Sequence, residues 1–281
     1  MKIYDVRQIS KERIKEKNLD ESVINLLLEA VLGMSHQEIL INNILELDEE
    51  EKCQYFSFLN RYLDNKEPLQ YILGYTYFYK RKFFVNKNVL IPRFETEELL
   101  YNALKIINQY NYKDIIDVGS GSGNIAITLK KEKEDLNVIG VDISSEALIM
   151  SKQNASLLDA DVKFYHSDLL SYLLENNLKV DMIISNPPYI DINDDEVDEI
   201  VKNNEPHLAL YAKDNGLYNY KKIIDDSLKV LNKNGSLIFE IGYKQGYDLV
   251  KYINDNHPYF DYKMIQDIDK KDRILLLTLK E

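Results

Sequence analysis

The pattern of apolar and polar positions divides the chain into a helical first part and a second part in which strands and helices alternate. Residues 23–32 are apolar nearly all round, as in a helix buried in a bundle. Two capping boxes, which begin at Ser35 and Asp48, predict the starts of two further helices. Apolar residues between 55 and 63 then recur at the spacing of one buried helical face. We therefore predict a small helical domain over residues 1–85, without catalytic groups and suited to recognition.

The stretch from 68 to 91 is rich in β-forming residues around Gly74, which predicts a hairpin or an extended linker. This linker extends to about residue 96 and leads into a helix. We place the domain boundary here, with a second domain over residues 97–281.

The second domain shows short apolar strands separated by helical segments, a pattern typical of an α/β fold with a mostly parallel sheet. The last two strands are joined by a turn too short for a helix, so one strand is expected to be antiparallel. The expected strands span 115–118, 138–142, 162–165, 181–185, 237–241, 261–266 and 274–279.

Composition narrows the protein class. The 281 residues are 45% hydrophobic and 29% charged, as in globular domains. No apolar run is long enough for a membrane span, and the first residues lack the apolar core of a signal peptide. Cys53 is the single cysteine and is predicted to lie in a helix interior. Together these features predict a cytoplasmic protein.

The formal net charge of −12 argues against strong nucleic-acid binding, because such binding depends on neutralising phosphates. No metal site is expected either, because the histidines lack ligand spacing; they are His36, His166, His207 and His257. The acidic run 191–199 is interpreted as a solvated face, with a surface that attracts a basic partner as the alternative.

A glycine-rich loop, Gly119–Gly123, follows the first expected strand, and Asp142 ends the second. The glycines permit close backbone approach to a ligand at a helix N-terminus, and the acid suits a ribose diol. The loop reads G-x-G-x-G and lacks both the dinucleotide pattern and the Gly-Lys of a P-loop. A nucleoside without pyrophosphate fits best, and S-adenosylmethionine is the obvious candidate.

The segment Asp181–Ile190 reads D-M-I-I-S-N-P-P-Y-I. The strand must end at Pro187, because proline has no N–H for the sheet ladder. Asn186 and the proline carbonyls then offer acceptors for an NH₂ group, and Tyr189 offers a flat aromatic face. This arrangement suits orienting a planar, weakly nucleophilic NH₂ beside an activated cofactor.

Six ordered motifs together resemble the release factor glutamine methyltransferases, also called HemK or PrmC, over nearly the full chain. The motifs are E-P-L-Q-Y-I-L-G (67–74), L-I-P-R-F-E-T-E (90–97), D-V-G-S-G-S-G (117–123), V-D-I-S (141–144), S-N-P-P-Y-I (185–190) and N-E-P-H-L-A-L (204–210). The resemblance implies a Rossmann-like seven-stranded methyltransferase sheet. It also implies methyl transfer from S-adenosylmethionine, which leaves S-adenosylhomocysteine, to the glutamine of the Gly-Gly-Gln motif in class 1 peptide chain release factors. Phe94 departs from the family, which usually has proline there.

Carried over by matching position, Gly119–Gly123, Asp142 and Asn186 would bind the cofactor, and Asn186–Tyr189 would hold the glutamine. The expected cofactor-binding residues are Asp117, Gly119, Ser120, Gly121, Ser122, Gly123, Asp142, Ile143, Asp168, Leu169 and Asn186. The expected substrate-binding residues are Arg93, Glu95, Asn186, Pro187, Pro188 and Tyr189. Of these, Asn186, Pro187 and Tyr189 are the expected catalytic residues.

Two other functional classes remain open from the sequence. A nucleic-acid methyltransferase acting on adenine N6 or guanine N2 would also hold a planar NH₂, but it needs a basic recognition region that this acidic chain does not show. A non-catalytic binding module could keep the fold, although the intact glycine loop, Asp142 and Asn186 favour activity.

Overall fold

The computed structural model describes residues 1–194 and 197–280. These residues form two compact units, one of Met1–Tyr75 with Asp198–Asn204 and one of Thr76–Val197 with Glu205–Glu281. The acidic run predicted at 191–199 includes residues 195 and 196, which lie outside the described residues.

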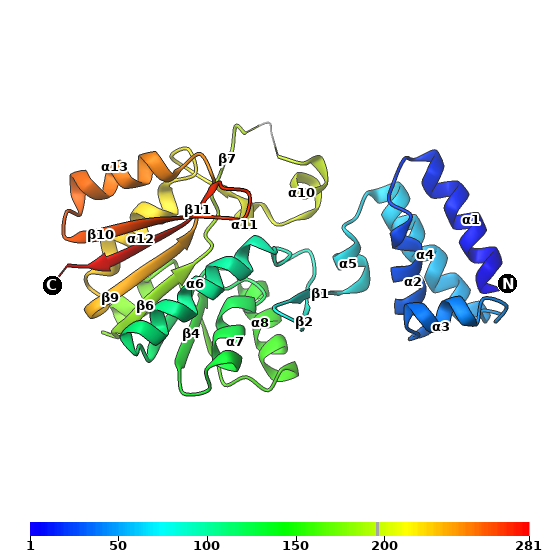
Figure 1. Cartoon of the computed structure of the whole chain (residues 1–281), viewed down its shortest axis with the longest axis horizontal. Helices are drawn as coiled ribbons and strands as arrows, with labels where there is room; N and C mark the ends of the chain where they lie inside the picture. The colour runs from blue at the N-terminus through cyan, green and yellow to red at the C-terminus, as the bar shows by residue number, and fades with distance from the viewer. Residues whose placement is uncertain (195–196, 281) are drawn as a thin grey trace. The chain divides into compact units, whose positions relative to one another are not determined.

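The first unit is helical (Figure 1). Its helices are α1 (Ile3–Glu16), α2 (Ser22–Leu32), α3 (His36–Ile41), α4 (Glu49–Asn65), α5 (Leu69–Leu73) and α10 (Glu199–Asn204). Apolar side chains from α1 to α5 form one core. Tyr55, Leu59 and Leu63 of α4 lie in it, which confirms the buried helical face predicted from the sequence.

Both predicted capping boxes are present. The Ser35 Oγ accepts a hydrogen bond from the Glu38 backbone N–H at 3.4 Å, and Glu38 Oε2 accepts from the Ser35 N–H at 2.8 Å. Asp48 and Glu51 exchange the same two bonds at 2.8 and 2.9 Å. Cys53 lies inside α4, as predicted, and its side chain is exposed.

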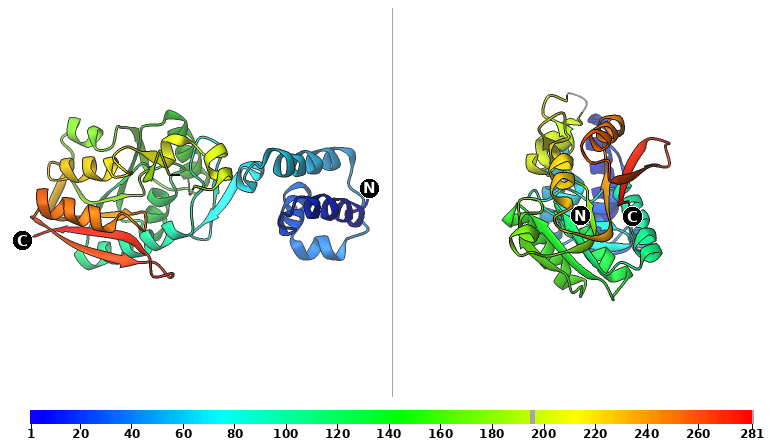
Figure 2. Two further views of the ribbon diagram at one scale, coloured as in Figure 1. Left: turned by 90° about the horizontal axis from the view of Figure 1, so that it is seen from above. Right: turned by 90° about the vertical axis from the view of Figure 1, so that its left-hand side faces the viewer.

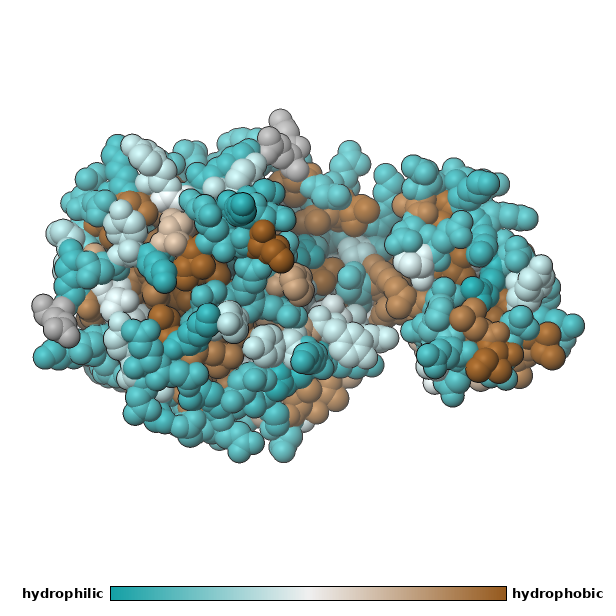
Figure 3. Space-filling model, viewed as in Figure 1, coloured by the Kyte–Doolittle hydropathy of each residue, from teal (hydrophilic) through white to brown (hydrophobic). Residues whose placement is uncertain are grey.

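Apolar side chains also gather on the surface of the first unit near α3 (Figure 3). Leu40, Ile41, Ile44 and Leu45 are all exposed there. Contiguous exposed apolar patches are typical of interaction surfaces, which supports a recognition role for the helical unit.

A hairpin of β1 (Tyr75–Phe78) and β2 (Arg81–Phe84) follows α5. Gly74 is the left-handed C-cap of α5 at φ +78°, so part of the stretch predicted as extended is helical. Phe78 and Phe83 of the hairpin are buried in the core of the second unit. The two units therefore divide at Tyr75, before the boundary placed between 85 and 97 from the sequence.

The second unit contains a seven-stranded sheet in the order β10-β11-β9-β6-β3-β4-β5. β11 runs antiparallel to both its neighbours, and β3, β4, β5, β6 and β9 are parallel, which confirms the expected single antiparallel strand. The strands are β3 (Asp114–Val118), β4 (Asn137–Asp142), β5 (Lys163–His166), β6 (Val180–Ser185), β9 (Leu231–Glu240), β10 (Phe260–Gln266) and β11 (Asp272–Leu279).

Helices cover both faces of this sheet (Figures 1 and 2). One core lies between the sheet and α6, α7 and α8, and a second lies between the sheet and α9, α12 and α13. The helices are α6 (Glu95–Tyr110), α7 (Asn124–Glu132), α8 (Ser145–Leu157), α9 (Ser171–Glu175), α11 (His207–Leu210), α12 (Tyr218–Ser227) and α13 (Gly246–Asn256). A short parallel pair, β7 (Ile190–Asp191) and β8 (Tyr211–Ala212), lies outside the sheet.

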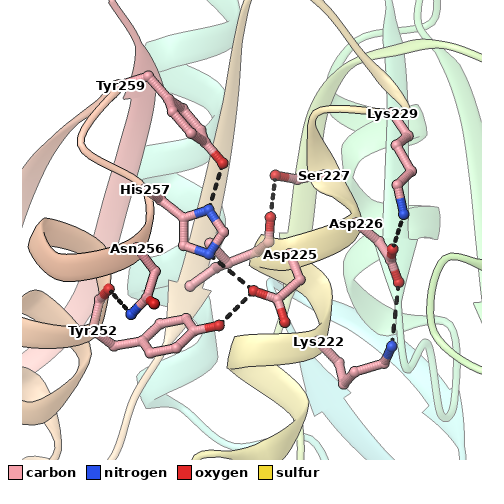
Figure 4. A network of polar contacts seen from close by, with 10 residues as sticks. Lys222, Asp225, Asp226, Ser227, Lys229, Tyr252, Asn256, His257 and Tyr259 are labelled. Atoms are coloured by element: carbon pink, nitrogen blue, oxygen red, sulfur yellow. Dashed lines mark hydrogen bonds and ion pairs between the residues drawn. The ribbon is translucent and has the colours of Figure 1, made fainter.

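A polar network joins α12 to α13 and the segment after it (Figure 4). Asp225 accepts hydrogen bonds from the Tyr252 hydroxyl and, at 2.9 Å, from His257 Nε2. The other ring nitrogen of His257 contacts the Tyr259 hydroxyl. His257 is thus engaged in packing the outer helices together.

Two general properties follow from the described residues. None of their helices is long and apolar enough to cross a membrane. Within the same residues, no group of three or more histidine, cysteine, aspartate or glutamate side chains is placed to hold a metal ion.

Candidate active site

A cavity of about 350 Å³ lies at the carboxyl ends of the parallel strands, where ligands bind in open α/β sheets. The loops after β3, β4, β5 and β6 converge there because these strands are neighbours in register. The predicted site residues that line it are Arg93, Gly119, Ser120, Gly121, Ser122, Asp142, Ile143, Asp168, Leu169, Asn186 and Pro188.

The glycine loop after β3 is held against the end of β4. The backbone N–H groups of Gly119 and Ser120 both donate to the Val141 carbonyl, at 2.9 and 3.0 Å. Gly119 and Gly121 have φ of +76° and +55°, and no atom lies within 4 Å of the place where a Cβ would stand. The backbone at these two glycines is therefore open to a ligand in the cavity.

Gly123 lies close to the side chains around it. Its φ is +80°, and a Cβ there would lie 2.9 Å from Ile127 Cδ1 and 3.1 Å from the Phe164 ring. Gly123 does not line the cavity and instead allows α7 to pack closely on the sheet.

Asp142 ends β4 and faces the cavity. Its two carboxylate oxygens accept backbone hydrogen bonds from Gly121 and Ser144, each at 2.8 Å. Burial raises the pKa of this carboxyl, and the two backbone N–H groups act in the opposite direction. Each carboxylate oxygen has a second lone pair, so the orientation that the backbone imposes leaves acceptors for a diol.

Asp117 lies behind the glycine loop and does not line the cavity. It is fully buried, and one oxygen accepts from Ser120 Oγ at 2.8 Å and from the Ala126 N–H at 3.3 Å. The other oxygen has no hydrogen-bond partner among the described residues. Burial raises the pKa of Asp117 to about 7. Its contacts brace the loop and the start of α7.

Asn186 lies at the end of β6 and lines the cavity. Its Nδ2 donates to Thr96 Oγ1 at 3.1 Å, and Thr96 Oγ1 donates to Glu240 Oε2 at 2.7 Å. Glu240 is 2% exposed, and burial raises its pKa to about 7. Sequence reasoning missed this chain of bonds, although a charged residue at the end of an otherwise apolar strand was a visible signal.

Pro187 and Tyr189 are not among the residues that line the cavity. Pro187 is buried, and the Tyr189 ring packs against the core between the sheet and the outer helices. Burial raises the pKa of Tyr189 to about 12. Its carbonyl accepts a hydrogen bond from Gln245 Nε2 at 2.8 Å. The Tyr189 ring is partly buried by this packing, and its role as an aromatic face for the substrate amide stays a prediction.

Arg93 and Glu95 have different surroundings. Arg93 lines the cavity, and its Nη2 donates to Glu205 Oε1 at 2.5 Å. Glu205 is buried and also accepts from the Ile91 N–H at 3.2 Å, which fixes the segment before α6 beside the cavity. Glu95 starts α6 and does not line the cavity.

Gly216 supports the turn after β6, because a Cβ there would lie 2.0 Å from the Tyr189 carbonyl oxygen. Its φ is +82°. We expect Gly216→Ala to lower the free energy of unfolding in urea by about 3 kcal/mol or more, since left-handed strain of roughly 1–2 kcal/mol adds to overpacking of roughly 1–3 kcal/mol. Gly119→Ala is the matched control, with a similar φ and open space, and only the strain is expected. Equal losses would contradict the close contact.

Family models match both parts of the chain. The PrmC N-terminal domain matches residues 5–74, and the Methyltransferase small domain matches residues 96–211.

Solved structures share the fold at low sequence identity. The hMettl16 catalytic domain, in complex with a 3'UTR hairpin, has a TM-score of 0.54 at 15% identity and covers 84% of each chain. The Thermus thermophilus 16S rRNA methyltransferase RsmC, in complex with AdoMet and guanosine, has a TM-score of 0.52 at 13% identity, over 73% of this chain and 50% of that one. The fold is therefore the Rossmann-like methyltransferase fold.

Closer relatives extend over the whole chain. A release factor glutamine methyltransferase from Bacillus cereus is 36% identical over 284 residues and covers 100% of both chains. One from Staphylococcus aureus is 44% identical over 210 residues, 74% of this chain and 75% of that one. One from Clostridium botulinum is 39% identical over 89% of each. The chain belongs to the family of release factor glutamine methyltransferases.

Proposed function

We propose that this protein transfers a methyl group from S-adenosylmethionine to the side-chain amide nitrogen of the glutamine in the Gly-Gly-Gln motif of class 1 peptide chain release factors. The full-length relatives support this reaction. The observation that carries the proposal is the hydrogen bond from Asn186 to Thr96. It uses one hydrogen of the Asn186 NH₂ and directs that nitrogen to Thr96, which leaves the carbonyl oxygen of this cavity-lining amide available as an acceptor.

The cavity fits the cofactor. The open space beside Gly119 and Gly121 admits a ligand against the loop backbone. The Asp142 carboxylate, held by two backbone N–H groups, offers acceptors for both hydroxyls of a ribose. Ile143 and Leu169 line the same cavity and supply apolar surface for a base. S-adenosylmethionine, when bound, supplies an activated methyl group.

The protein contributes by fixing the orientation of the substrate amide and by excluding water from it. An amide nitrogen is a poor nucleophile, because its lone pair is delocalised, so alignment accounts for much of the catalysis. The Asn186 Oδ1 would accept a hydrogen of the glutamine NH₂. This acceptor also stabilises the positive charge that develops on that nitrogen. We assign no general base, since the methylated nitrogen loses its extra proton readily.

The substrate is tested with labelled S-adenosylmethionine and three acceptors offered separately: a purified class 1 release factor, duplex DNA and ribosomal RNA. We expect label in the release factor alone. A release factor in which the Gly-Gly-Gln glutamine is replaced by alanine should take up none. Label in either nucleic acid, or undiminished label in the altered release factor, would contradict the proposed substrate.

A further inference from the structure

We propose that Thr96 and Glu240 are positioning residues that select the orientation of the Asn186 side-chain amide. They hold its Nδ2 away from the substrate, so that its Oδ1 receives the glutamine NH₂. This inference rests on the proposed function. Thr96 itself lines the cavity, and Glu240 contacts Asn186 only through Thr96.

The need for such a device follows from the shape of an amide. A carboxamide turned by 180° occupies nearly the same volume but exchanges an acceptor for two donors. Only the acceptor can bind the NH₂ of a glutamine. If the Asn186 NH₂ pointed toward the substrate, it would face the NH₂ of the glutamine. Two donors cannot form a hydrogen bond with each other, so the substrate amide would be misplaced. The orientation must therefore be fixed by what Asn186 contacts on its other side.

The direction of the hydrogen bonds among Glu240, Thr96 and Asn186 fixes the orientation of the Asn186 amide. A carboxylate has no hydrogen to donate, so the 2.7 Å bond between Thr96 and Glu240 uses the single hydroxyl hydrogen of Thr96. Thr96 Oγ1 then has only lone pairs for Asn186, which must present its Nδ2 at 3.1 Å. Thr96 comes from α6, Glu240 from β9, and Asn186 from the segment directly after β6. Both Thr96 and Glu240 are buried, so water does not compete for these bonds.

The charges around Glu240 act in both directions. Arg273 on β11 and Arg93 before α6 favour its ionised form, whereas burial and Glu95 on α6 oppose it. Tyr189 and Tyr220, both with pKa values raised chiefly by burial, face the same carboxyl. The Tyr220 hydroxyl also donates to the backbone carbonyl of Glu240 at 2.8 Å.

Protonation of Glu240 would remove the preference for one orientation of the Asn186 amide. A neutral carboxyl can donate its hydrogen to Thr96 Oγ1, which frees the Thr96 hydroxyl hydrogen to donate to Asn186 Oδ1. The reversed amide then becomes acceptable. Because burial raises the pKa of Glu240 to about 7, kcat should be fully developed above this pH and should fall as pH falls through it.

The first experiment compares wild type with Glu240→Gln, Thr96→Val and Thr96→Ser in pH profiles of release factor methylation. At about pH 8 we expect Glu240→Gln and Thr96→Val to lose about 10-fold in kcat, because only a fraction of the molecules keeps the competent orientation. In both variants, kcat should no longer fall as the pH decreases through about 7, the pKa of Glu240 in wild type. Thr96→Ser keeps the hydroxyl and should retain both kcat and its fall with decreasing pH. The affinity for S-adenosylhomocysteine, measured by calorimetry, should not change in any variant.

A second readout does not depend on activity. In ¹⁵N-labelled protein, the Asn186 side-chain NH₂ signals, identified by their loss in Asn186→Ala, should shift with pH near 7 in wild type and Thr96→Ser. They should not titrate in Thr96→Val. If Glu240→Gln fails to fold, the two Thr96 variants and this titration still decide the question.

The outcomes separate the two levels of inference. Wild type that does not methylate the release factor would defeat the proposed function. Wild type that does, together with Thr96→Val and Glu240→Gln variants that keep the wild-type kcat and pH profile, would overturn the positioning role alone.

Discussion

Replacing Asn186 by alanine is expected to lower kcat by about 10²–10³-fold, the loss typical of removing one preorganised polar group from a developing charge. The Asn186 side chain is the cavity-lining acceptor that the Thr96 bond leaves available. Alanine leaves the cavity walls in place, so the affinity for S-adenosylhomocysteine should change much less than kcat. The measurement is steady-state methylation of a release factor, with calorimetry for the cofactor product.

Asn256→Ala is the matched control for this variant. Asn256 is exposed at the end of α13 and donates only to the Tyr252 carbonyl within its own helix turn. The Asn256→Ala variant should methylate the release factor at the wild-type rate. An Asn186→Ala variant with wild-type turnover would contradict the assignment of the site.

Asp142→Ala is expected to weaken binding of S-adenosylhomocysteine by about 10²-fold or more, because hydrogen bonds to a charged group contribute roughly 1.5–3 kcal/mol each. The loss is larger than for a simple contact, since the Gly121 and Ser144 N–H groups also lose their acceptor and the glycine loop loses its support. Calorimetric titration of each variant with S-adenosylhomocysteine measures the effect.

Asp142→Asn should lie between wild type and alanine, because one oxygen acceptor is kept. Asp161→Ala removes an exposed carboxylate just before the first residue of β5. This variant should bind S-adenosylhomocysteine as tightly as wild type. Unchanged affinity in Asp142→Ala would mean that the ribose is not held at the end of β4.

Much of the fold was predictable because the local signals agree with the final structure. The apolar runs that end at Asp142 and Asn186 become parallel strands of the central sheet, since strands buried on both faces read as continuous apolar segments. The capping boxes of the first unit are equally local, each within four residues.

Other elements escaped prediction because nonlocal contacts decide them. β9 begins at Leu231, earlier than expected, since pairing with β6 extends the strand through a polar segment with Asn234 at φ +63°. The hairpin of β1 and β2 belongs to the second unit because Phe78 and Phe83 find their core there.

The candidate site was likewise predictable where local motifs mark its residues and unpredictable where nonlocal contacts decide. The cavity-lining Gly119, Asp142 and Asn186 were visible in motifs. The bond from Thr96 to Glu240 joins residues 144 positions apart, and no spacing rule connects them. Tyr189 was expected in the site from its chemistry and from the family resemblance, and its partly buried ring packs against the core.

A crystal structure with S-adenosylhomocysteine and a peptide containing Gly-Gly-Gln tests the arrangement most directly. We expect the glutamine NH₂ within hydrogen-bonding distance of Asn186 Oδ1, the Asn186 Nδ2 still on Thr96, and the amide nitrogen turned toward the cofactor sulfur. A glutamine bound elsewhere, or an Asn186 side chain facing away from both ligands, would contradict it.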